Sequence, residues 1–185
     1  MRPAVVVIDM VRETFEHETP ITPQARAIVP AVNRLTAWAR GQSLPVVFAC
    51  DSFLPDDFIF GGRMKPHSLR NTPGSEPATE LERRPGDVVL PKRRFSAFFK
   101  TDLDQSLRTW GADTVVVCGI ATHFCVLATA LDAVCHDFQA VLVEDATASY
   151  SPALHRQTLD LYRNNPLQPL LEVLDAQGVM SKYAG

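Results

Sequence analysis

Apolar residues gather in six short, continuous runs that are separated by longer amphipathic stretches. The runs are rich in valine, leucine and alanine, and they do not alternate with polar residues. Strands buried on both faces have this composition, as in a parallel sheet covered by helices on both sides. We therefore expect strands at residues 4–8, 45–50, 87–90, 114–118, 140–143 and 170–173.

The stretches between these runs carry helix signals. Thr22-Pro23 is typical of a helix start, and apolar residues from Ile28 to Ala39 recur at helical spacing before Gly41. Further helices are expected at about 101–110, 123–135 and 151–164. The alternation of strands and helices predicts an α/β protein, a three-layer doubly wound domain with a mostly parallel, about six-stranded sheet.

One long segment interrupts this alternation. Residues 51–86 are polar and rich in glycine and proline. A loop of this length inside a compact domain is usually functional or disordered, so we expect a substrate or cap loop there. The chain shows no internal repeat and no low-complexity linker, which favours one domain over residues 1–185.

Composition narrows the class of function. The 185 residues are 46% hydrophobic and 21% charged, with a net charge of -3, so nucleic acid and anionic membranes are not expected partners. No apolar stretch is long enough to span a bilayer, and the first run is too short for a signal peptide. The four cysteines have no metal-binding spacing. We expect a cytoplasmic protein with free thiols.

Candidate reactive groups follow the predicted strands. In open α/β sheets, ligands bind at the carboxyl ends of the strands. The residues at those positions should therefore converge on one edge of the sheet. They are Asp9, Asp51, Lys92, the segment 119–125 with Cys125, and Glu144-Asp145.

Cys125 is the candidate nucleophile. It stands in the first turn of a predicted helix, where the helix dipole lowers a thiol pKa from its usual value of about 8.5. Lys92 would stabilise the thiolate, and Asp9 would accept the thiol proton and return it to the leaving group. Taken singly, each residue also has a structural interpretation: a small core residue, a surface lysine and a capping aspartate.

Several motifs together resemble one family. The matching segments are Val6–Met10, Lys92–Phe98 with Thr101–Leu103, Gly119–Val126 with Thr129–Ala133, and Glu144–Ala146. They occur in the same order over nearly the whole chain. On these segments the chain is similar to the isochorismatase-like cysteine hydrolases, which are related to nicotinamidases.

The resemblance implies a site and a mechanism. It assigns the triad to Asp9, Lys92 and Cys125, and the oxyanion hole to the backbone N–H groups of Ala121 and Cys125, with the Ile120–Ala121 peptide cis. It also implies a six-stranded parallel sheet and a homodimer or homotetramer. The expected reaction is cleavage of a C–N bond in a small amide or ureide through a thioester.

The resemblance is less complete for metal and substrate. Asp51 and His67 match two metal ligands of nicotinamidases, but Phe53 stands where a histidine is needed, so we expect no metal and no other cofactor. Met64 replaces the tryptophan that precedes the second histidine. The expected substrate-binding residues are Phe15, Phe53, Phe95 and His123. The alternatives are a nicotinamidase with a degenerate metal site and a non-catalytic binding protein on the same scaffold.

Overall fold

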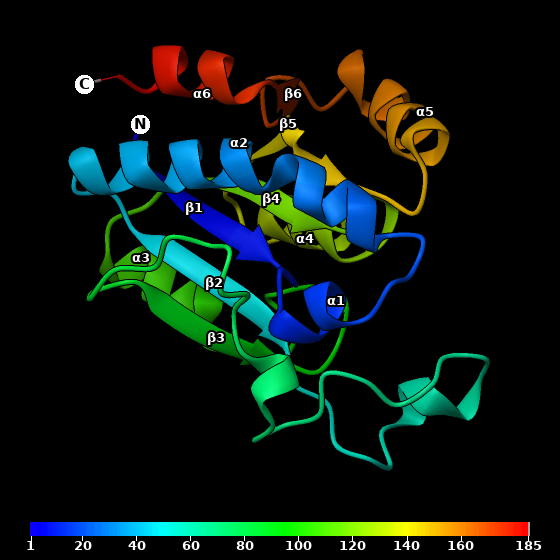
Figure 1. Ribbon diagram of the computed structural model, residues 1–185. Coiled ribbons are helices and arrows are strands. Elements are labelled where there is room, and N and C mark those ends of the chain that lie inside the picture. The colour runs from blue at the N-terminus through cyan, green and yellow to red at the C-terminus, as the bar shows by residue number, and fades with distance from the viewer. Residues whose placement is uncertain (185) are drawn as a thin grey trace.

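The computed structural model, described here over residues 1–184, contains a six-stranded sheet in which all neighbouring strands are parallel. The strand order is β3-β2-β1-β4-β5-β6 (Figure 1). The strands are β1 (Pro3–Ile8), β2 (Val46–Asp51), β3 (Val88–Lys92), β4 (Thr114–Ile120), β5 (Gln139–Ala148) and β6 (Leu171–Leu174). All six predicted strands are present, and the predicted fold class is confirmed.

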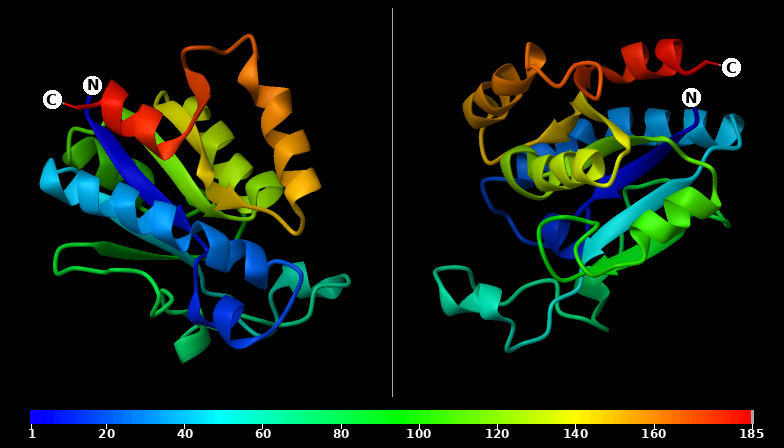
Figure 2. Two further views of the ribbon diagram at one scale, coloured as in Figure 1. Left: turned by 45° about the horizontal axis from the view of Figure 1, so that its top comes forward. Right: turned by 180° about the vertical axis from the view of Figure 1, so that it is seen from behind.

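Helices cover both faces of the sheet (Figures 1 and 2). Helices α2 and α6 contribute to one hydrophobic core, and α3, α4 and α5 contribute to the other. Within residues 1–184, no helix combines the length and apolarity needed to cross a bilayer. The α-helices are α1 (Arg12–Glu16), α2 (Thr22–Gly41), α3 (Leu103–Thr109), α4 (Leu127–Cys135), α5 (Pro152–Arg163) and α6 (Ala176–Lys182).

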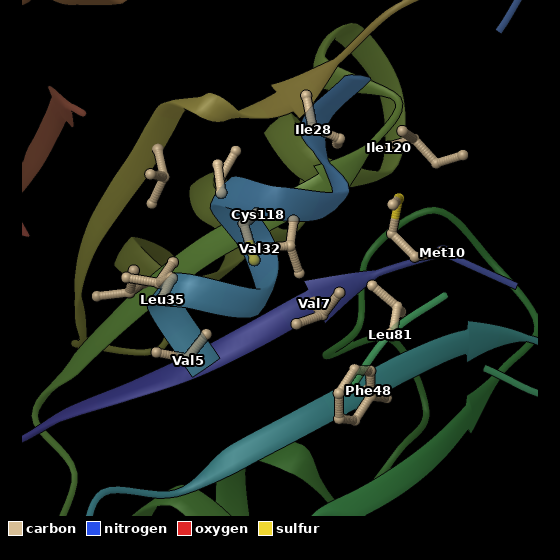
Figure 3. Close-up of a cluster of buried hydrophobic side chains, with 14 of the residues drawn as sticks. Val5, Val7, Met10, Ile28, Val32, Leu35, Phe48, Leu81, Cys118 and Ile120 are labelled. Carbon is tan, nitrogen blue, oxygen red and sulfur yellow. The ribbon is translucent and has the colours of Figure 1, made fainter. Parts of the chain in front are cut away.

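Alternate residues of the central strands fill the two cores. On β1, Val5 and Val7 point toward α2, where they join Val32 and Leu35 (Figure 3). The intervening residues of β1 belong to the core on the opposite face. Because each fully buried valine or leucine contributes about 1.5–3 kcal/mol, these layers fix the sheet against its helices.

The structure differs from the prediction around β5. This strand continues to Ala148, with a register irregularity between β4 and β5 at Val117/Gly119. Glu144 and Asp145 therefore lie inside the strand. Glu144 pairs with Arg163 of α5, and Asp145 accepts a hydrogen bond from the first residue of α6. The expectation that these two acids join the other strand-end groups is wrong. Helices α1 and α6 were not expected.

The segment between β2 and β3 has little regular structure. It contains two short 3-10 turns, η1 (Phe58–Gly61) and η2 (Pro73–Ser75). In Figure 1 the part around η1 projects past the carboxyl ends of β1 and β2. A bridge between Phe53 and Leu69 ties the two sides of this projection together.

Candidate active site

Three charged side chains meet where β1, β2 and β3 end. Asp51 and Lys92 are register partners across β2 and β3, and Asp9 directly follows β1. The Lys92 ammonium lies 2.8 Å from Asp9 Oδ2 and 2.6 Å from Asp51 Oδ1. It also donates a hydrogen bond to the carbonyl of Arg94 at 3.1 Å. The lysine is thus held between two carboxylates in the protein interior.

The backbone fixes Asp9 in this cluster. Its N–H donates to the Ala49 carbonyl at 2.9 Å, and its Oδ1 accepts the Asp51 N–H at 2.8 Å. The neighbouring strand approaches closely because Gly119 has no side chain. A Cβ there would lie 2.2 Å from the Ile8 carbonyl oxygen, and its φ of +102° also favours glycine. Glycine at this position allows β4 to pass beside Asp9.

Cys125 reaches the same cluster from β4. The strand ends at Ile120, the Ile120–Ala121 peptide is cis as the resemblance implies, and a single π-helical turn, η3 (Thr122–Val126), leads into α4. The thiol sulfur lies within 4.8 Å of a carboxylate oxygen of both Asp9 and Asp51. Cys125 therefore sits in a tight turn before α4, and the structure brings together all three residues predicted as a triad.

Burial dominates the electrostatics of the cluster. Desolvation, followed by the charge of Asp51, raises the pKa of Asp9 to about 7 against the opposing effect of Lys92. Desolvation and the Asp9 charge raise the pKa of Cys125 well above its usual value, so the expectation of a lowered thiol pKa is wrong. Burial alone would lower the pKa of Lys92, but Asp9, Cys125 and Asp51 together raise it well above its usual value. The resting site therefore holds a neutral thiol beside a cationic lysine.

The cluster opens into a cavity of about 250 Å³. Cys125, Ala121 and the carboxyl groups of Asp9 and Asp51 lie on its border. The Ala121 N–H makes no backbone hydrogen bond within residues 1–184, so it remains available to a ligand. The remaining lining residues are Val11, Glu13, Thr14, His17, Thr19, Ile21, Phe53, Ile59, Met64, His67, Ser68, Phe95, Ile120, Phe124 and Tyr150.

Two of the four predicted substrate-binding residues line this cavity. Phe53 and Phe95 do, whereas Phe15 is buried in the core beneath α1 and α2. The His123 ring contacts the Ser149 hydroxyl and packs against Phe124 and Tyr150 without bordering the cavity. Phe15 and His123 therefore do not border this cavity, and their expected role in substrate binding stays a prediction. In both cases a neighbour along the chain faces the cavity instead.

Several cavity residues were missed. Glu13 and Thr14 come from the unpredicted helix α1, and His17 from the turn after it. Tyr150 follows the unpredicted extension of β5. The contact between Asp51 and Lys92 could have been predicted from the sequence, because the two residues follow consecutive predicted strands.

Comparisons with known proteins identify related sequences and a matching family. The family described as Isochorismatase domain matches residues 3–177. The chain is 32% identical over 168 residues to the phenazine biosynthesis protein PhzD1 of Pseudomonas aeruginosa, covering 86% of this chain and 78% of that protein. It is 47% identical over 73 residues to the ureidoacrylate amidohydrolase RutB of Pantoea ananatis, covering 40% and 29%.

Solved structures show the same fold. The N-carbamoylsarcosine amidase of Thermoplasma acidophilum superposes with a TM-score of 0.81 and 36% identity, covering 95% of this chain and 97% of that one. The pyrazinamidase of Pyrococcus horikoshii, solved in complex with zinc, gives a TM-score of 0.81 and 28% identity, covering 95% and 99%.

The zinc in that structure raises the question of a metal in this chain. Asp9, Asp51 and Cys125 have donor atoms close enough to share an ion, but the Lys92 ammonium already contacts both carboxylates. His67, the other candidate ligand, is not part of this group. Its Nδ1 faces the carbonyl of Lys65 at 2.9 Å, and its ring packs edge-on against Phe53. The expectation that the chain binds no metal stays a prediction.

Proposed function

The chain belongs to the isochorismatase family, and from that premise we propose that it hydrolyses a C–N bond of a small amide or ureide through a thioester on Cys125. Relatives named as a ureidoacrylate amidohydrolase and an N-carbamoylsarcosine amidase support this class of substrate. The observation that carries the proposal is the position of the Cys125 sulfur, on the cavity border and within 4.8 Å of an Asp9 oxygen.

Acylation begins with a proton transfer. Because the Cys125 thiol is protonated at rest, Asp9 takes its proton as the sulfur attacks the carbonyl carbon. The oxygen of the tetrahedral intermediate accepts hydrogen bonds from the N–H groups of Ala121 and Cys125. Asp9 then gives the proton to the leaving nitrogen, the C–N bond breaks, and ammonia or an amine departs from the thioester.

Deacylation uses the same groups in reverse order. Asp9, again a carboxylate, takes a proton from water as its oxygen attacks the thioester. The C–S bond breaks, the acid leaves, and the proton returns to the Cys125 sulfur.

Lys92 acts mainly through Asp9 in this scheme. Its ammonium contacts the carboxylates of Asp9 and Asp51. Its charge lowers the pKa of Asp9 against the effect of burial, so that Asp9 can act as a base. Asp51 completes the charge balance around the lysine. The role expected for Lys92, stabilising the thiolate, is thus shared with a role in setting the basicity of Asp9.

A screen of ammonia release over small amides and ureides tests the proposal. Cys125→Ala should abolish release from every substrate that the wild type cleaves, and Cys135→Ala should not, because Cys135 is an exposed thiol on α4. Release that survives Cys125→Ala would refute the covalent route. Nicotinamide belongs in the screen, since the alternative reaction is that of a nicotinamidase with a degenerate metal site. The cytoplasmic location and the homodimer or homotetramer stay predictions.

A further inference from the structure

The charged residues that line the cavity are acidic, and Lys92 contacts two of them without lining the cavity itself. Asp9 and Asp51 border its floor, and Glu13 borders its wall. Within residues 1–184, no lysine or arginine lines it. Two histidines, His17 and His67, also line it, and the polar uncharged lining residues are Thr14, Thr19, Ser68 and Tyr150.

Three basic side chains near the cavity have acidic partners. Arg93 and Arg94 both bind Asp57, which is buried beneath them. Arg12, next to Glu13 in α1, pairs with Glu16 and Glu76. No side chain of this group is free to neutralise a second carboxylate on a bound ligand.

Glu13 is held in place on the cavity wall. One of its oxygens, Oε2, accepts the backbone N–H of Ser68 at 2.5 Å. Gly74 packs against it so closely that a Cβ there would lie 2.9 Å from the same oxygen. Glu13 therefore joins α1 to the 51–86 segment, and its other oxygen makes no hydrogen bond within residues 1–184.

We propose that the cavity selects amides whose remaining part is neutral or cationic, excludes those that carry a carboxylate, and uses Glu13 as the acceptor for a cation or N–H group of the substrate. The inference rests on the proposed function in calling the ligand a substrate. An anionic ligand would lose its hydration beside acidic residues and meet no lysine or arginine among the described lining residues, whereas a cation would meet acidic partners there.

Three amides of matched length test the proposal by turnover. They are hexanamide, 6-aminohexanamide and the monoamide of adipic acid, which differ at the far end of the chain in being neutral, cationic and anionic. We expect kcat/KM for the anionic amide to be at least about tenfold below that for hexanamide, and the cationic amide to match or exceed hexanamide. An anionic amide cleaved within about tenfold of hexanamide would overturn the proposal.

Paired variants on one helix test the role of Glu13. Glu13→Gln keeps an oxygen for the Ser68 N–H but removes the charge, so the ratio of kcat/KM for the cationic amide to that for hexanamide should fall. Glu16→Gln lies on the same helix and does not border the cavity, so it should leave that ratio unchanged. Equal ratios in wild type, Glu13→Gln and Glu16→Gln would remove Glu13 from the proposal.

Alkylation tests the charge preference without turnover. Iodoacetamide and iodoacetate both alkylate a cysteine sulfur with loss of iodide. Iodoacetamide is neutral, and iodoacetate is an anion. The rate ratio is the alkylation rate with iodoacetamide divided by that with iodoacetate. Measured by peptide mass spectrometry, this ratio at Cys125 should exceed the ratio at the exposed Cys135 of the same chain by at least about tenfold. Equal ratios would overturn the inference. Selective alkylation without any amide turnover would instead count against the proposed function alone.

Discussion

The floor and the wall of the cavity are built in different ways. The floor consists of Asp9, Asp51 and Cys125, and the buried Lys92 contacts both carboxylates. Asp51 and Lys92 are register partners on parallel strands, and Asp9 directly follows β1. The wall comes largely from α1 and from the 51–86 segment, which has few regular hydrogen bonds of its own. We infer that the sheet positions the proposed reacting groups, and that the wall selects the molecules that reach them.

Substitutions in the floor and in the wall should have different effects on stability and activity. The floor contains three charges that compensate one another where water is excluded, so removing one leaves the others unbalanced. Some wall residues, such as Glu13 and Met64, are only partly buried. Floor variants should therefore lose both stability and activity, and wall variants should change recognition.

Lys92→Met should have the largest effect. It leaves Asp9 and Asp51 without their shared cation, which we expect to cost about 3–5 kcal/mol in the free energy of unfolding at pH 7 and at least about 10³-fold in kcat/KM. Urea denaturation and the ammonia assay measure the two quantities. The control is Lys65→Met, in the exposed segment of the wall, which should change stability by no more than about 0.5 kcal/mol. Similar losses in both variants would end the distinction between floor and wall.

The pH profile should follow Asp9. A base with a pKa of about 7 is protonated in acid, so kcat/KM should fall about tenfold per pH unit below that point, to about 1% at pH 5. The folded pKa lies above the ordinary value of 3.8, so the native state binds more protons than the unfolded state between these values. The contribution of Asp9 to stability should therefore decrease as pH rises from about 4 to 7. Asp9→Asn should abolish that slope in urea titrations.

Asp51→Asn should have an intermediate effect. The charge of Asp51 raises the pKa of Asp9, so its removal should move the acidic limb of the kcat/KM profile to lower pH. We expect a loss of about tenfold at the optimum, because Lys92 loses one of its ionic partners. If the acidic limb of the kcat/KM profile does not shift in Asp51→Asn, that limb does not reflect the ionisation of Asp9.

Met64→Ala should have the smallest effect. Met64 borders the cavity from a partly exposed position, so its loss should raise KM about threefold with kcat nearly unchanged. Stability should change by less than about 1 kcal/mol. A fall in kcat as large as that of Asp51→Asn would place Met64 in the reaction rather than in recognition.

The floor could be predicted from the sequence because its signals are local and repeated. Continuous apolar runs predict parallel strands, parallel strands place their carboxyl ends together, and Asp9, Asp51 and Lys92 stand at those ends. The same rule failed for Glu144-Asp145, because β5 continues past them to Ala148. An apolar run indicates where a strand lies, but it does not indicate whether the strand continues through the polar residues that follow.

The wall could not be predicted in the same way. Helix α1 is only five residues long, and its orientation decides that Glu13 borders the cavity while Phe15 enters the core. The position of His123 likewise depends on the π-helical turn that precedes α4. Phe53 and Phe95 were found because they adjoin strand ends that the sheet positions. The orientation of residues in short helices and turns could not be predicted, because a shift of one residue there decides which side chain faces the cavity.

The most direct test of the thioester is a partition experiment with hydroxylamine. Hexanamide and N-methylhexanamide share an acyl group and differ in the leaving amine, so a common acyl-Cys125 intermediate would divide between water and hydroxylamine in the same proportion from either substrate. We predict equal ratios of hydroxamate to hexanoic acid at each hydroxylamine concentration. Ratios that depend on the leaving amine would contradict the covalent route.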